Sequence, residues 1–236
     1  MTLMISKFRC LLPCAMAVTM VACAPLTVPP REEYPVGRAR LVMPSDAWQD
    51  LGATEEIVDR SLLQTRAVGL RDAQGAWLAV VRVQTNRDGR LSGSAPWFGA
   101  CPPQDNVAVQ DAAASSPVRM DCLRLKRWAS SAQWLDKNRP GFARWLAGQQ
   151  IAVAQPYLHV GYWYATAGGA TVVVDALVDQ RLLIPRARNN EEFMAAGLPA
   201  RQWARELSQA ARLSIGMMDG YLAVPPFPLT DTALRN

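Results

Sequence analysis

Few residues in this sequence could carry out catalysis, and their spacing matches no familiar catalytic or metal site. There is a single histidine, His159, so a His-x-x-His metal site is excluded. Beyond residue 23 the chain has no G-x-S-x-G or S-x-x-K motif to activate a serine, and no glycine-rich phosphate loop. His159 lies in an apolar strand-like segment, which is typical of a hydrogen-bonded core histidine. We therefore expect no enzyme, no cofactor and no metal.

Two carboxylates, Asp175 and Asp179, could in principle form an acid–base pair. Asp175 and Asp179 fall on the same face of one expected strand. At ~3.4 Å per residue they lie roughly 13 Å apart, beyond the ~5–9.5 Å that separates paired glycosidase carboxylates. We expect them to lie on a solvated strand face.

Cys23 follows a basic start and an uncharged apolar run. Lys7 and Arg9 are the only charges before it, and prolines follow it. This order is typical of a secretory signal. A transmembrane anchor is the alternative, but the apolar stretch 10–26 contains Pro13 and is shorter than the ~20 residues that span a bilayer. Cleavage between Ala24 and Pro25 is a second alternative.

The sequence Met20-Val21-Ala22-Cys23 resembles the lipobox of bacterial lipoprotein precursors. The resemblance implies that residues 1–22 are a signal peptide and that the Cys23 thiol receives a diacylglycerol, anchoring the chain to a membrane. Ala24 replaces the aspartate of the inner-membrane retention signal, which favours the periplasmic leaflet of the outer membrane. A periplasmic or inner-membrane-anchored protein is the alternative. Residues 23–37, rich in proline, are expected to form an extended tether.

Cys101 and Cys122 are the two remaining thiols, because Cys10 and Cys14 lie in the expected signal and Cys23 is expected to be acylated. In an oxidising compartment they are expected to form a disulfide. Because closing this loop lowers the conformational entropy of the unfolded chain, the disulfide is expected to contribute about 3 kcal/mol to the free energy of unfolding. A free redox pair and a metal site are the alternatives. Disulfide formation would leave no free thiol for Cys–His catalysis.

Positive charge and tryptophan are concentrated between residues 119 and 145. Aromatic rings beside arginines are typical of surfaces that bind anionic partners. The alternative is that the tryptophans are core residues and the charges a solvated face. The candidate binding residues are Arg119, Arg124, Lys126, Arg127, Trp128, Trp134, Lys137, Arg139 and Arg144. Without Lys7 and Arg9 of the expected signal, 23 basic and 20 acidic residues leave a net charge of +3, which is too small to indicate nucleic-acid binding.

The elements expected to position these residues describe an α+β fold, a mostly antiparallel sheet with helices packed on one face, in a single domain over 38–236. Strands are expected at 38–44, 62–72, 76–86 and 118–128, and a helical turn or loop at 45–60. Two short helices are expected at 130–138 and 140–150, then a hairpin around Gly168-Gly169 and a long helix from Pro199. If the two glycines form a two-residue loop, His159 and Trp163 face the core and Asp175 faces solvent.

These features predict an envelope-anchored lipoprotein that binds an envelope protein or an anionic glycan or lipid. A periplasmic carrier or sensor of a small apolar ligand is the first alternative. An enzyme with an unfamiliar site is the second.

Overall fold

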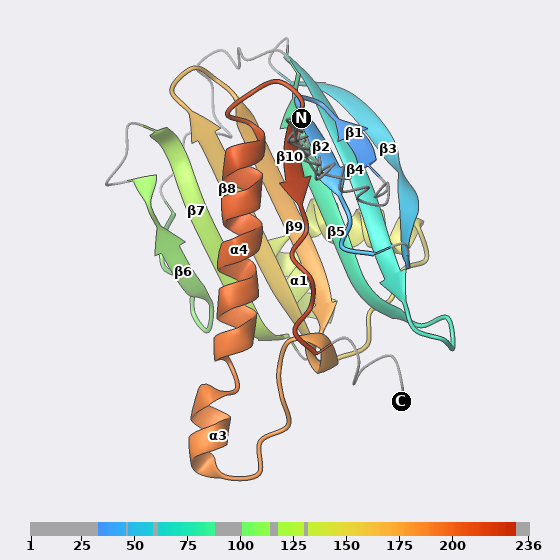
Figure 1. Cartoon of the computed structure of the whole chain (residues 1–236), viewed down its shortest axis with the longest axis vertical. Coiled ribbons are helices and arrows are strands. Elements are labelled where there is room, and N and C mark those ends of the chain that lie inside the picture. The colour runs from blue at the N-terminus through green and yellow to red at the C-terminus, as the bar shows by residue number, and fades with distance from the viewer. Residues whose placement is uncertain are drawn as a thin grey trace, which may run out of the picture. The chain divides into compact units, whose positions relative to one another are not determined.

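The computed structural model describes residues 33–45, 47–58, 61–87, 101–113, 118–129 and 132–229. Their main feature is a seven-stranded sheet, antiparallel throughout, with the order β3-β4-β5-β9-β8-β7-β6 (Figure 1). Its strands are β3 (Trp48–Val58), β4 (Ser61–Arg71), β5 (Trp77–Asn86), β6 (Ala108–Asp111), β7 (Val118–Ala129), β8 (Tyr157–Thr166) and β9 (Thr171–Asp179).

A smaller sheet and four α-helices complete the described part. β1 (Glu33–Val36) pairs antiparallel with β2 (Ala39–Val42), and β10 (Gly220–Ala223) pairs parallel with β2. The helices are α1 (Ala132–Asn138), α2 (Pro140–Gly148), α3 (Asn190–Ala195) and α4 (Leu198–Ser214), with a 3-10 turn at Gln180–Leu182. Because β1 begins at Glu33, the last residues of the segment 23–37 belong to the folded body.

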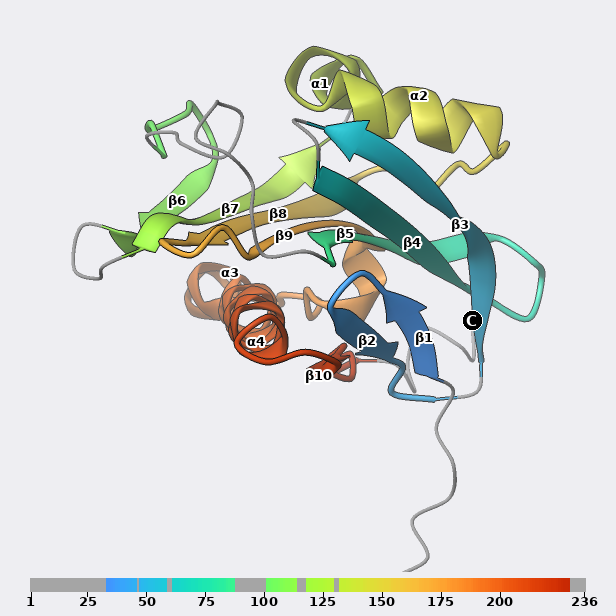
Figure 2. The same ribbon diagram turned by 90° about the horizontal axis from the view of Figure 1, so that it is seen from above.

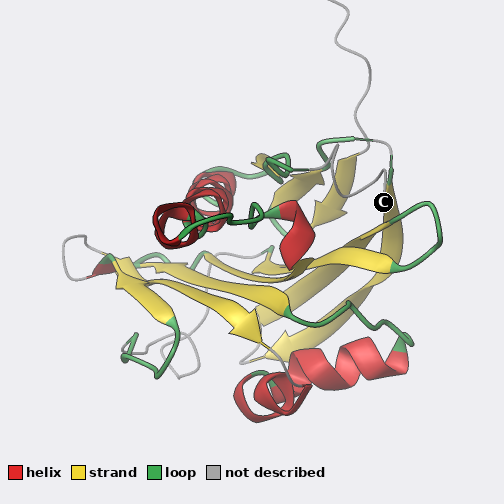
Figure 3. Ribbon diagram, turned by 90° about the horizontal axis from the view of Figure 1, so that it is seen from below, coloured by secondary structure: helices red, strands yellow, loops and turns green. Residues whose placement is uncertain are grey.

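The large sheet is covered on both faces, which explains the composition of its central strands. All nine residues of β9 are buried, and a strand covered on both sides reads as a continuous apolar run. α4 and the smaller sheet lie against one face, while α1 and α2 lie against the other (Figures 2 and 3). The mostly antiparallel sheet is as expected, but the helices occupy two faces rather than one.

α4 packs through an apolar stripe at helical spacing. Trp203, Leu207, Ala211 and Ile215 are all buried against the sheet, as the i, i+4, i+8 pattern predicts. Met218, three residues after Ile215, lies beyond the end of the helix and is exposed.

Two expectations about the strands are wrong. Residues 48–58 form the edge strand β3 rather than a helical turn or loop, and its register shifts between Asp50 and Ala53. Residues 52–57 of this strand are all solvent-exposed. They therefore lack the alternation of apolar and polar residues that identifies a half-buried strand. In the β8–β9 hairpin, Ala165 pairs with Thr171, so the loop between them holds an odd number of residues. The pairing of β8 with β9 therefore differs by one residue from the register expected for a two-residue loop. Such a shift exchanges the faces of every side chain on the strand.

Candidate functional site

A row of four residues crosses the sheet on the face that carries α1 and α2. Arg82 of β5 is paired with Asp175 of β9, Asp175 with Gly161 of β8, and Gly161 with Arg124 of β7. We call these four residues the cross-sheet row. It places a carboxylate and two guanidinium groups in one line, with Gly161, which has no side chain, between Asp175 and Arg124.

Asp175 is the buried anion of this row. Its side chain is 1 % exposed, and Arg139 holds it at two points, Nε to Oδ1 at 2.9 Å and the second guanidinium nitrogen to Oδ2 at 2.6 Å. Arg82 donates to Oδ2 at 3.0 Å. Burial opposes ionisation, but the hydrogen bond from His159 and the charge of Arg139 outweigh it and lower the pKa of Asp175. The expected solvated face is therefore wrong for Asp175.

Asp179 is also buried, with 3 % of the residue exposed, so the expectation of a solvated face fails for it as well. Its carboxylate accepts hydrogen bonds from the Arg181 backbone and guanidinium. It caps the turn that follows β9 and is not part of the cross-sheet row.

His159 is a core histidine, as the sequence predicts. It is 2 % exposed, and Nε2 lies 3.2 Å from Oδ1 of Asp175. Its ring packs against Trp134 with the centroids 5.4 Å apart. Burial lowers its pKa, against the opposing effect of Asp175. A neutral, enclosed imidazole of this kind supports the sheet rather than meeting a substrate.

Gly161 makes room for Trp163. A Cβ at position 161 would lie 2.5 Å from the Trp163 ring, so the indole folds back over the strand only because the side chain is absent. The guanidinium carbon of Arg139 lies 4.4 Å from the Trp163 ring centroid and that of Arg124 lies 5.7 Å from it. Trp163 therefore holds two arginines through cation–π contacts.

Arg124 and Lys126 have carbonyl partners instead of carboxylates. Arg124 donates to the Pro102 carbonyl and Lys126 to the Asn106 carbonyl, each at 3.3 Å. Lys126 also lies 5.9 Å from the Trp134 ring centroid. The Nε of Arg124 is buried without a hydrogen-bond partner among the described residues. Burial and the nearby charge of Arg139 lower the pKa of Arg124.

These contacts define what we call the basic aromatic face: Arg82, Arg124, Lys126, Trp134, Arg139, Trp163 and Asp175. It carries four cations and one carboxylate. Asp105 and Asp136 form no ion pair with these cations in the part of the chain that the structure describes. The excess of positive charge lies on partly buried side chains, where an anion is attracted more strongly than at a fully hydrated surface.

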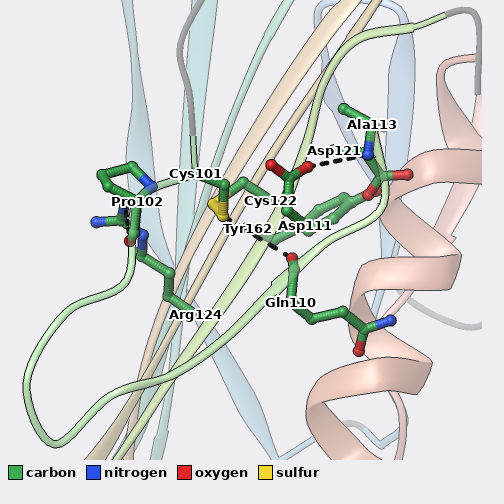
Figure 4. The surroundings of a disulfide bond; sticks show 9 residues. All are labelled: Cys101, Pro102, Gln110, Asp111, Ala113, Asp121, Cys122, Arg124 and Tyr162. Atoms are coloured by element: carbon green, nitrogen blue, oxygen red, sulfur yellow. Dashed lines mark hydrogen bonds between the residues drawn. A yellow bond between two sulfur atoms is a disulfide. The ribbon is translucent and has the colours of Figure 1, made fainter. Parts of the chain in front are cut away.

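The disulfide between Cys101 and Cys122 borders this face and is confirmed, with a Cα–Cα distance of 5.5 Å (Figure 4). It attaches the segment from Cys101 to β7, and this segment supplies the carbonyls of Pro102 and Asn106. The disulfide thus fixes the partners of Arg124 and Lys126.

The structure brings together only part of the predicted basic region. Arg124, Lys126, Trp134 and Arg139 join the face. Arg127 lies against Gly197, which precedes α4, and so belongs to the other side of the sheet. The remaining candidates are spread along their elements: Arg119 near the start of β7, Trp128 49 % exposed near its end, and Lys137 and Arg144 exposed on α1 and α2. Cys23 lies outside the described residues.

Sequence reasoning missed three members of the face, Arg82, Trp163 and Asp175. They lie on strands outside the basic region, and the one-residue error in hairpin register placed Asp175 on the wrong side. Gly161, in the middle of the strand sequence 157–166, was a usable signal, since glycine in a strand often marks a close approach of another group.

No protein-family model, curated protein or solved structure matches this chain. Within the described ranges, no helix has the length and apolar character needed to cross a membrane. No three His, Cys, Asp or Glu side chains in those same ranges are grouped as metal ligands.

Proposed function

We propose that this protein is an envelope-anchored bacterial lipoprotein with a non-catalytic role, which binds an anionic component of the envelope through the basic aromatic face. The observation that carries the proposal is the pairing of Arg124 and Lys126 with backbone carbonyls, beside indole rings, while Asp175 is already held by two other arginines.

Such an arrangement favours an anionic partner for a physical reason. A partly buried guanidinium has lost hydration that a neutral carbonyl replaces only in part, and a phosphate or carboxylate would replace it with a charge-assisted hydrogen bond. Trp134 and Trp163 restrict the directions in which the cations point, which lowers the entropy lost on binding. The burial of His159 against Asp175 supports binding over acid–base catalysis here.

The anchor sets the distance over which this face would act. The predicted tether between Cys23 and β1 comprises residues 24–32, and at ~3.1 Å per residue it would reach about 28 Å when extended. The proposed partner would therefore lie close to the anchoring membrane.

The apolar-carrier alternative has less support. A pocket of about 180 Å³ includes Trp145 in its wall, which is smaller than the ~300–1,000 Å³ typical of small-molecule sites. The larger pocket described below is lined mainly by polar side chains.

Crosslinking of the full-length protein in its native envelope tests the proposal. The double variant R124E/K126E should lose the crosslinked anionic component, whereas R144E, which also reverses a charge but on the exposed surface of α2, should retain it. Identical crosslinking patterns for the wild type and R124E/K126E would contradict the proposal, as would a captured component without acidic groups.

A further inference from the structure

A second polar site lies on the opposite side of β7 from the basic aromatic face. A pocket of about 340 Å³ lies between α4 and residues of β6, β7 and β8. This volume falls at the lower end of the ~300–1,000 Å³ range of small-molecule sites. Its polar lining includes Gln110, Asp121, Tyr162, Arg205, Gln209 and Arg212.

One side of α4 forms a wall of this pocket. Arg205, Gln209 and Arg212 recur at i, i+4 and i+7, so their side chains project from the same side of the helix. This side adjoins the apolar stripe that packs on the sheet, and it meets Gln110 of the short strand β6 across the pocket.

The floor of the pocket is a buried and ordered polar cluster. Asp121 is 5 % exposed and Tyr162 is 2 % exposed. The Tyr162 hydroxyl donates to Oδ1 of Asp121 at 3.0 Å, and Arg212 donates to Oδ2. Burial, reinforced by the charge of Asp121, raises the pKa of Tyr162, so the hydroxyl stays protonated as a donor.

Arg212 is held in place by two contacts at once. Besides Asp121, its guanidinium carbon lies 5.4 Å from the Tyr164 ring centroid, and Tyr164 stacks on Tyr162 at 6.3 Å. Its side chain is nevertheless 40 % exposed. Part of a pre-oriented guanidinium therefore remains open to a ligand, which reduces the ordering cost of binding.

The charges of the lining specify the kind of ligand. Asp121 compensates Arg212, while Arg205 forms no ion pair within the described residues, so the lining carries one net positive charge. We propose that this pocket binds a small polar molecule bearing a single carboxylate, with Arg205 and the open edge of Arg212 as donors to that carboxylate and Gln110 and Gln209 as partners for its polar body. A phosphate monoester, with nearly two negative charges at neutral pH, matches this lining less well.

The disulfide gives this site a fixed wall. Asp111, next to Gln110, pairs with Cys122, and Cys122 is bonded to Cys101 (Figure 4). Asp121 and Cys122 are adjacent on β7, so their side chains leave the strand on opposite faces. These two neighbouring residues of β7 therefore border both sites, which lie on opposite faces of the strand.

Calorimetric titration of the full-length protein in detergent tests this inference with two pairs of probes. D-glucuronate is compared with D-glucose, and the tripeptide Ala-Ala-Ala is compared with its C-terminal amide. The two comparisons distinguish a sugar acid from a peptide C-terminus as the ligand. At least one carboxylate should bind more tightly than its neutral counterpart. R205A should weaken that binding about tenfold or more, as expected for a lost charge-assisted hydrogen bond.

R201A is the matched control, because Arg201 is an exposed arginine on the same helix outside the pocket lining. It should change the affinity less than about twofold. The inference is overturned if neither carboxylate is preferred over its neutral counterpart, or if R205A and R201A have equal effects. Charge reversals on the basic aromatic face should leave this binding unchanged, so the two sites are tested independently.

Discussion

Arg139 joins α1 to α2 and forms a two-point ion pair with Asp175, 36 residues away in the centre of the sheet. The same guanidinium lies over Trp163. One side chain therefore fastens the helix pair to the sheet and also positions the aromatic ring of the basic aromatic face.

D175N should strongly destabilise the protein. The substitution keeps the side-chain size but leaves Arg82 and Arg139 partly buried without a counter-charge, and breaking a buried pair in this way costs about 3–5 kcal/mol. Urea unfolding gives the free energy. D50N removes the more exposed partner of Arg66 and should cost less than about 1 kcal/mol. Equal effects of the two substitutions would refute the role assigned to Asp175.

The free energy of unfolding should decrease as the pH falls below about 6.5, the ordinary pKa of histidine. Because burial lowers the pKa of His159 in the folded state, the unfolded chain binds a proton in this range before the folded protein does. The free energy of unfolding then decreases by at most ~1.4 kcal/mol per pH unit as the pH falls.

His159 is the only histidine in the chain, so the variant H159Q should flatten this dependence between about pH 5 and 7. Urea titrations at several pH values measure it. A slope that persists unchanged in H159Q would show that another group is responsible. The depressed pKa of Asp175 acts separately: its contribution is complete above about pH 4, the ordinary aspartate pKa, and is lost as the pH falls further.

The disulfide should contribute about 3 kcal/mol to stability. The double variant C101S/C122S removes it and leaves no unpaired thiol at either position. Its unfolding free energy should match that of the wild-type protein measured in reductant. A loss below about 1 kcal/mol would mean that strand pairing between β6 and β7 suffices to hold this segment.

The processed protein should begin at Cys23 and carry acyl chains. Intact-mass analysis of protein extracted from the envelope measures both properties, and the variant C23A should lack the acyl mass. An unmodified thiol at Cys23, or a different first residue, would contradict the lipoprotein assignment.

Sequence patterns predicted most of the elements, because apolar periodicity and turn residues report directly on local structure. They located strands β4 and β5, the β8–β9 hairpin, α4 and the disulfide partners. They failed where long-range register decides the result. Asp175 faces the helix pair only because the hairpin loop is odd in length, and Arg82 reaches it through pairing of β5 with β9.

The basic region illustrates the same limit within the candidate site. Its sequence predicted one continuous surface over 119–145. The alternation of β7 and the irregularity after Lys126 place Arg127 on the other side of the sheet from Arg124 and Lys126. Clustering in sequence therefore identified four members of the basic aromatic face but not its boundary.

The most direct test of the account measures retention of the detergent-solubilised protein on immobilised envelope extract. The wild-type protein should be retained, and R124E should reduce its affinity about tenfold or more, whereas R144E should change it less than twofold and added salt should weaken it. Equal retention of R124E and R144E, or retention that does not respond to salt, would contradict the claim that Arg124 and its neighbours bind an anionic envelope component.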